Sequence, residues 1–165
     1  QTLPIPPSRL VPMARQTPCL LLLILAVSAQ PLIGQEERQH IDPRHPSDAE
    51  ALPFSGAVQV GNTLYLSGTL GLEADRTVPT DPAVEARRAL DSMRSTLLAA
   101  GMDMDDLVSV QIFCSDLSLY QVFNDVYRTY FQDAFPARAF IGSGPLLYGA
   151  RFEVMGVAVG GRQGG

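Results

Sequence analysis

The hydrophobic periodicity changes from strand to helix and back twice between Ala57 and Val159, and this alternation limits the folds open to the chain. Short runs with strand-like composition are separated by two amphipathic helical stretches. The strand-like runs lie at 57–60, 63–67, 107–114, 138–141 and 150–159. The resulting order, ββ-α-β-α-β-β, predicts an α+β fold: a single domain with a mixed β-sheet and two helices on one face.

The first helix has clear start and stop signals. Asp81 can cap it, Pro82 suits the first helical position, and Gly101 follows as a stop. Its apolar face is predicted to comprise Ala86, Leu90, Met93, Leu97 and Leu98.

The second helix is predicted to begin with a capping box formed by Ser118 and Gln121. Its apolar stripe comprises Val122, Phe123, Val126, Tyr127, Tyr130 and Phe131. Two helices cannot cover both faces of such a sheet, so we expect a homo-oligomer that buries the other face.

The ends of the chain differ in composition from this domain, which we place at 52–159. Residues 1–29 resemble an N-terminal extension with a signal peptide that starts near Met13 and is cleaved before Gln30. Residues 30–51 are polar and predict a linker, and 160–165 form a Gly-rich tail. We therefore expect export to the periplasm or the medium, with no membrane span after cleavage; the alternative is an uncleaved membrane anchor.

Composition excludes several chemistries. The net charge of −5 disfavours binding to nucleic acid. Without any Lys, all twelve positive charges are Arg, so a lysine Schiff base is impossible. Both histidines precede residue 51, which excludes serine–histidine catalysis and histidine metal sites from residues 51–165. No nucleotide-binding glycine fingerprint occurs, and we expect neither a metal nor a cofactor.

Five segments resemble the RidA/YjgF family of imine and enamine deaminases. They are Pro53-Phe-Ser-Gly-Ala57, Gly61-Asn-Thr-Leu-Tyr-Leu-Ser-Gly68, Phe123-Asn-Asp-Val-Tyr127 with Phe131, Pro136-Ala-Arg138, and the closing run 149–159. Together they cover 52–159. The resemblance implies a chorismate-mutase-like α+β fold and a homotrimer with a cleft at each subunit interface.

The resemblance also implies a ligand site. Arg138 would pair with the substrate carboxylate, a role that suits a planar guanidinium because it can donate two parallel hydrogen bonds. Ser67 and Gly68 match the end of the second strand, where the family contacts its ligand. Asn124 matches a position near the cleft, and Phe140 shares a sheet face with Arg138.

Two positions depart from the family pattern. Ungapped alignment from Arg138 places Met155 where active members carry a water-holding Glu, and methionine cannot activate water. Glu153 lies two residues earlier on the same face and is a possible substitute. Phe54 replaces a Tyr of the family and so lacks its hydroxyl.

Three functions remain open at this point. The first is a deaminase that hydrolyses reactive 2-imino or enamine acids to 2-oxo acids and ammonia, with Arg138 as the carboxylate anchor. The second is a non-catalytic trimer that binds small carboxylates or related metabolites, which Met155 and Phe54 favour. The third, an RNA-cleaving or translation-inhibiting member of the family, is disfavoured by the acidic charge and by the absence of Lys and, in the domain, of His.

Overall fold

The computed structural model describes residues 37–42, 53–132 and 134–161. The expected signal peptide at 1–29 lies outside the described residues, as do most of the expected linker and the last four residues of the tail. In the described part of the chain, no helix combines the length and the apolar character that a membrane span needs.

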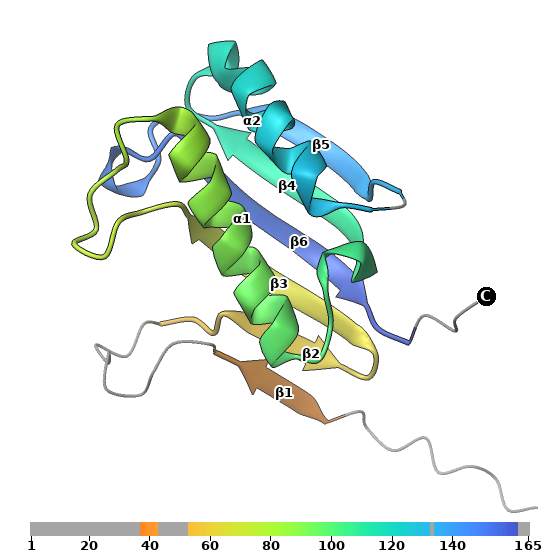
Figure 1. The fold of residues 1–165 in the computed structure, drawn as a ribbon. Helices are drawn as coiled ribbons and strands as arrows, with labels where there is room; N and C mark the ends of the chain where they lie inside the picture. Colours follow the sequence, from red (N-terminus) through yellow and green to blue (C-terminus); the bar gives the residue numbers. More distant parts are fainter. Residues whose placement is uncertain (1–36, 43–52, 133, 162–165) are drawn as a thin grey trace, which may run out of the picture. The chain divides into compact units, whose positions relative to one another are not determined.

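The described residues form one mixed six-stranded sheet, with strand order β1-β2-β3-β6-β4-β5 (Figure 1). The strands are β1 (Arg38–Ile41), β2 (Ala57–Val60), β3 (Thr63–Leu70), β4 (Leu107–Cys114), β5 (Ala137–Gly142) and β6 (Phe152–Val159). β4 and β5 run parallel, and every other neighbouring pair is antiparallel. This arrangement confirms the predicted α+β fold.

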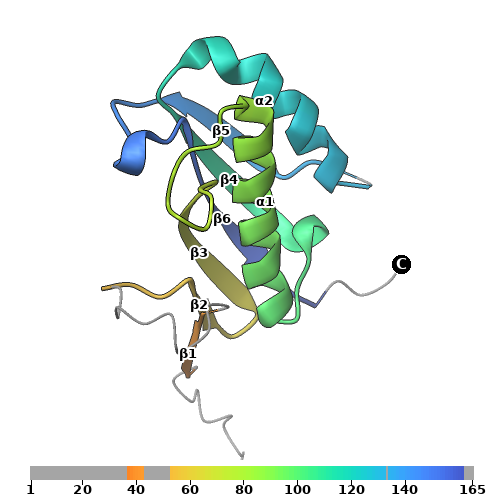
Figure 2. The same ribbon diagram turned by 60° about the vertical axis from the view of Figure 1, so that its left-hand side comes forward.

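Both helices cover the same face of the sheet, as Figures 1 and 2 show from two directions. α1 (Pro82–Ala99) begins as predicted, because the Asp81 carboxylate accepts a hydrogen bond from the Ala83 N–H at 2.8 Å. The prediction for Leu98 was wrong: its side chain is 58% exposed. Leu98 lies one residue, and thus about 100°, beyond Leu97 on the helix, which turns it away from the buried face.

α2 (Tyr120–Tyr127) is shorter than predicted, and the expected capping box is absent. The Asp116 carboxylate instead accepts from the Ser118 N–H at 2.9 Å and caps a 3₁₀ turn over Leu117–Leu119. The Gln121 side chain donates to Asp125 at 2.7 Å. Asp116, two residues before the predicted cap Ser118, is therefore the residue that caps this segment. A second 3₁₀ turn, Arg128–Tyr130, follows α2.

The β2–β3 hairpin forms as predicted, but β3 continues to Leu70 through residues expected to be a loop. A bulge interrupts its pairing with β6 between Leu66 and Thr69. Gly71 follows at a close approach to α1, where an added Cβ would lie 1.9 Å from the backbone oxygen of Glu85. Such contact requires glycine at position 71. The end of the strand was misjudged because Gly68, which lies inside β3, is a residue type that weakens strands.

β1 lies within the segment expected to be a linker. It pairs antiparallel with β2, with His40 opposite Val58, and Ile41 packs against the core. The other β1 residues are exposed, so the strand lacks the apolar alternation that would reveal it in the sequence.

The sheet face opposite the helices carries exposed apolar side chains. Tyr65 is 53% exposed. Tyr65 lies between its cross-strand partners Val58 and Val157, which are half-buried, so this face is apolar over several strands. Its composition agrees with the expectation that another copy of the chain covers it.

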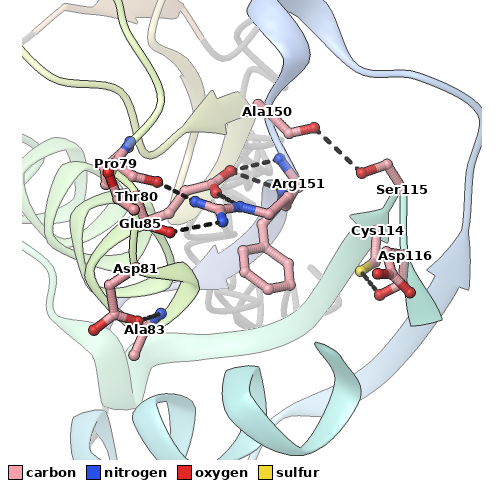
Figure 3. A network of polar contacts seen from close by, with 11 residues as sticks. Pro79, Thr80, Asp81, Ala83, Glu85, Cys114, Ser115, Asp116, Ala150 and Arg151 are labelled. Atoms are coloured by element: carbon pink, nitrogen blue, oxygen red, sulfur yellow. Dashed lines mark hydrogen bonds and ion pairs between the residues drawn. The ribbon is translucent and has the colours of Figure 1, made fainter. Parts of the chain in front are cut away.

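A fully buried carboxylate, that of Glu85, ties the first turn of α1 to the start of β6 (Figure 3). One oxygen accepts from the backbone N–H groups of Arg151 at 2.6 Å and Phe152 at 3.1 Å, and the other pairs with the Arg151 guanidinium. Arg151 also donates to the carbonyls of Pro79 and Thr80. The network therefore fixes a loop, a helix and a strand to one another.

We expect Glu85→Ala to lower the free energy of unfolding by about 3–5 kcal/mol, because it leaves the Arg151 charge and two N–H groups without their acceptor. Urea denaturation measures the change. The matched control is Glu73→Ala, which removes the exposed ion pair with Arg88 and should cost less than about 1 kcal/mol. Equal losses in the two variants would contradict this assignment.

Candidate functional site

Arg138, on β5, points toward α2. Its Nη1 donates a hydrogen bond to Asn124 Oδ1 at 2.7 Å, and Asn124 is buried in α2. No carboxylate within the described ranges forms an ion pair with Arg138. The guanidinium therefore keeps donors free for an anion, while Asn124 fixes its orientation.

Aromatic rings surround this guanidinium. Its central carbon lies 4.8 Å from the ring centroid of Tyr127, 5.9 Å from that of Tyr120 and 6.0 Å from that of Phe140. Phe140 in turn packs edge-to-face on Phe123, with centroids 5.6 Å apart. The rings hold the cation in place and lower the polarity around it, which strengthens its attraction for a bound carboxylate.

A cavity of about 300 Å³ opens beside Arg138. Its polar lining comes from Asn124, Arg128 and Arg138, and its apolar lining comes from Tyr120, Tyr127, Phe135 and Pro136. A positive group in an apolar recess suits a small organic anion. We call Arg138, Asn124, Phe140 and this recess the arginine half-site.

A second cluster lies at the bulge of β3. The bulge sets Ser67 and Gly68 opposite Met155, because Leu66 pairs with Gly156 and Thr69 pairs with Val154. The Glu153 side chain packs against Gly68: a Cβ built on Gly68 would lie 2.1 Å from Glu153 Oε1. Only glycine leaves room for that carboxylate. We call Ser67, Gly68, Glu153 and Met155 the glutamate half-site.

The glutamate half-site contains a carboxylate near the position where the family pattern has its water-holding Glu. The resemblance places that role at Met155, whose thioether cannot perform it. The structure puts the Glu153 carboxylate against Gly68 in the same cluster, where a carboxylate oxygen can accept a hydrogen bond from water.

Phe54 belongs to a segment whose backbone is hydrogen-bonded to the glutamate half-site. The Ser67 hydroxyl donates to the Ser55 carbonyl at 2.7 Å, and the Ser67 N–H donates to the Gly56 carbonyl at 3.0 Å. These bonds hold the segment 53–56 against the bulge, and Phe54, 52% exposed, belongs to that segment.

The two half-sites project from opposite faces of the sheet. Arg138 pairs with Val110, which is fully buried beneath the helices, whereas Glu153 pairs with Phe113. Residues 110 and 113 are an odd number apart on β4, so their side chains point to opposite faces. The structure thus groups Arg138 with Asn124 and Phe140, and Glu153 with Ser67 and Gly68, but does not join the two groups within one chain.

Sequence reasoning predicted Phe140 but missed the two tyrosines beside Arg138. Tyr127 was interpreted only as a core residue, and Tyr120 was not considered. Both lie on the same side of α2 as Asn124, three and four residues away, and this spacing was the available signal.

Tyr127 carries an unsatisfied group. Its side chain is buried, and its hydroxyl has no hydrogen-bond partner among the described residues. Burial raises the pKa of Tyr127 to about 12, and the nearby charge of Arg138 only partly opposes the shift. The hydroxyl therefore stays protonated at neutral pH.

Fold and site together define a class: an α+β protein with two helices on one face of a mixed sheet and a cavity lined by an arginine and aromatic side chains. The comparisons agree. The family described as Endoribonuclease L-PSP matches residues 46–160. A bovine 2-iminobutanoate/2-iminopropanoate deaminase is 40% identical over 111 residues, which cover 66% of this chain and 81% of the bovine protein.

Solved structures show the same fold. RidA from Psychrobacter sp. PAMC 21119 has a TM-score of 0.66 at 28% identity, over 73% of this chain and 98% of that chain. The YjgF gene product of E. coli gives the same four values. The chain therefore belongs to the RidA/YjgF family.

We expect Tyr127→Phe to raise the free energy of unfolding at pH 7 by about 1 kcal/mol, because it removes a buried donor without a partner and keeps the ring. Since the folded-state pKa of Tyr127 is raised, the wild type should also lose stability above pH 10 or so, where the unfolded chain ionises first. The variant should lack this contribution. Urea denaturation at both pH values measures the difference; a less stable variant at pH 7 would show that the hydroxyl has a partner.

Proposed function

We propose that this protein hydrolyses small 2-imino acids to 2-oxo acids and ammonia. The observation that carries the proposal is the Arg138 guanidinium, which is oriented by Asn124, has no carboxylate partner in the described residues, and lines an apolar cavity. The bovine and mouse relatives bear the name 2-iminobutanoate/2-iminopropanoate deaminase, which agrees with this chemistry.

In the proposed reaction, Arg138 binds the substrate carboxylate through two parallel hydrogen bonds. The anchored carboxylate fixes the position of the adjacent imine carbon, and this orientation supplies much of the rate gain. Glu153 holds a water molecule and accepts its proton as the oxygen attacks that carbon. Glu153 passes this proton to the imine nitrogen, which gives an amino alcohol. The hydroxyl proton then moves to the nitrogen as the C=O bond forms and the C–N bond breaks, so that imine and water give the 2-oxo acid and ammonia.

We further propose that each site joins the arginine half-site of one copy to the glutamate half-site of another. Support comes from the opposite sheet faces on which Arg138 and Glu153 lie and from the exposed apolar face that carries Glu153. A closed homotrimer, the assembly expected from the family resemblance, would repeat this contact three times by symmetry.

A second candidate function is binding without catalysis. Two observations favour it: Met155 lies opposite the bulge, and Phe54 supplies no hydroxyl. A protein of this kind would bind 2-oxo acids or similar carboxylates through Arg138 and would leave imines to react with water unaided.

We expect the protein to accelerate hydrolysis of 2-iminobutanoate, which an amino-acid oxidase generates and semicarbazide traps. Arg138→Ala should lower kcat/KM by about 10- to 100-fold, since it removes charged hydrogen bonds to the carboxylate. Glu153→Gln should lower kcat more than it raises KM, because the amide cannot accept the proton from water.

The control for both variants is Arg87→Ala, which removes an exposed arginine on α1. If wild type fails to accelerate the reaction but 2-oxobutanoate still raises Tm in an Arg138-dependent way, the binding function replaces the deaminase. If neither effect occurs, both functions are wrong.

A further inference from the structure

His40 lies outside the residues that define the family, yet it contacts the neighbourhood of the glutamate half-site. It belongs to β1, which precedes the matched range 46–160. Its Nδ1 lies 2.9 Å from Ser55 Oγ, within hydrogen-bond distance. The segment expected to be a solvated linker thus supplies a side-chain contact to the folded domain.

Ser55 links His40 to the bulge of β3. Its side chain meets His40, and its carbonyl accepts the hydroxyl of Ser67 at 2.7 Å. Ser67 is followed by Gly68, and the Glu153 carboxylate lies where a side chain of residue 68 would otherwise be. A continuous series of polar contacts therefore runs from β1 to the glutamate half-site.

Register places His40 on the same face as this half-site. His40 pairs with Val58, Val58 with Tyr65, and Tyr65 with Val157 on β6. Val157 is four residues from Glu153 along the strand, so the two share a face. The imidazole accordingly lies on the sheet face opposite the helices, where the proposed site would close against another copy.

We propose that His40 is a positioning residue for the reaction site. Through Ser55 it holds the segment 53–56 over the bulge, and so sets the place of Phe54 and of the Ser67 hydroxyl. This inference rests on the proposed function, because those two residues matter only if a ligand binds beside them.

A purely structural role is poorly suited to this side chain. His40 is exposed, and the core contact of β1 comes from its neighbour Ile41. Pairing of β1 with β2 uses backbone groups and does not require the imidazole. Removal of the imidazole should therefore leave the sheet intact while freeing the Ser55 side chain.

The test compares full-length variants in the imine assay. His40→Leu should lower kcat/KM by about threefold to tenfold, the effect of one lost hydrogen bond, with Tm unchanged. His40→Asn should restore the wild-type value, because an Asn amide atom can occupy the place of Nδ1. Gln39→Ala is the matched control, because Gln39 is the neighbouring residue on β1 and its side chain points to the other face of the sheet.

A double-mutant cycle with Ser55→Ala tests whether the effect of His40 on kcat/KM passes through Ser55. If His40 acts through Ser55, the double variant His40→Leu/Ser55→Ala should be no slower than the slower single variant. The inference is overturned if His40→Leu matches wild type, if His40→Asn fails to rescue, or if the two losses multiply.

If the proposed deaminase function is wrong, the positioning role of His40 is tested by ligand binding. If wild type does not accelerate imine hydrolysis, the same variants are compared by their Kd for 2-oxobutanoate. A Kd raised by His40→Leu and restored by His40→Asn would support the positioning role without catalysis. Equal Kd values, or no binding by wild type, would overturn it.

Discussion

The buried Glu85 carboxylate fixes the start of β6, and the arrangement of the rest of the sheet depends on that strand. β6 lies between β3 and β4, so its position sets Glu153 against Gly68 on one side. On the other side it positions β4, which pairs with the strand that carries Arg138. A buried charge is costly unless every partner is present, and here two N–H groups and a guanidinium satisfy it. One ion pair thereby aligns both halves of the candidate site.

The two half-sites divide the chemistry between them. The arginine half-site offers positive charge, oriented donors and aromatic walls, which suit recognition of a carboxylate. The glutamate half-site offers a carboxylate beside a glycine, which suits a water molecule. The proposed hydrolysis needs both groups, since it assigns carboxylate binding to the arginine half-site and water activation to the glutamate half-site. Because the two half-sites lie on opposite faces of the sheet, the proposed reaction requires that the apolar open face meet another copy of the chain.

The start of α1 and the position of Arg138 could be predicted from the sequence, because each depends on residues that are close together in the chain. Asp81 and Pro82 marked the start of α1, and Arg138 stood out in its Pro-Ala-Arg context. The unpredicted features depend on contacts between distant segments. The bulge at Ser67 and Gly68 arises from pairing with β6, and the strand at His40 arises from pairing with β2. Spacing along the chain pointed to Glu153 as a substitute for Met155, but its close approach to Gly68 could be seen only in the structure.

The central claim is that one site draws Arg138 and Glu153 from different copies of the chain. The direct measurement mixes Arg138→Ala and Glu153→Gln, each of which should have strongly reduced activity alone, by refolding them together in equal amounts. If sites form between copies, random assembly of trimers should restore about one quarter of the wild-type activity, because one interface in four would hold both intact residues. If the mixture is no more active than the separate variants, Arg138 and Glu153 do not act together across an interface.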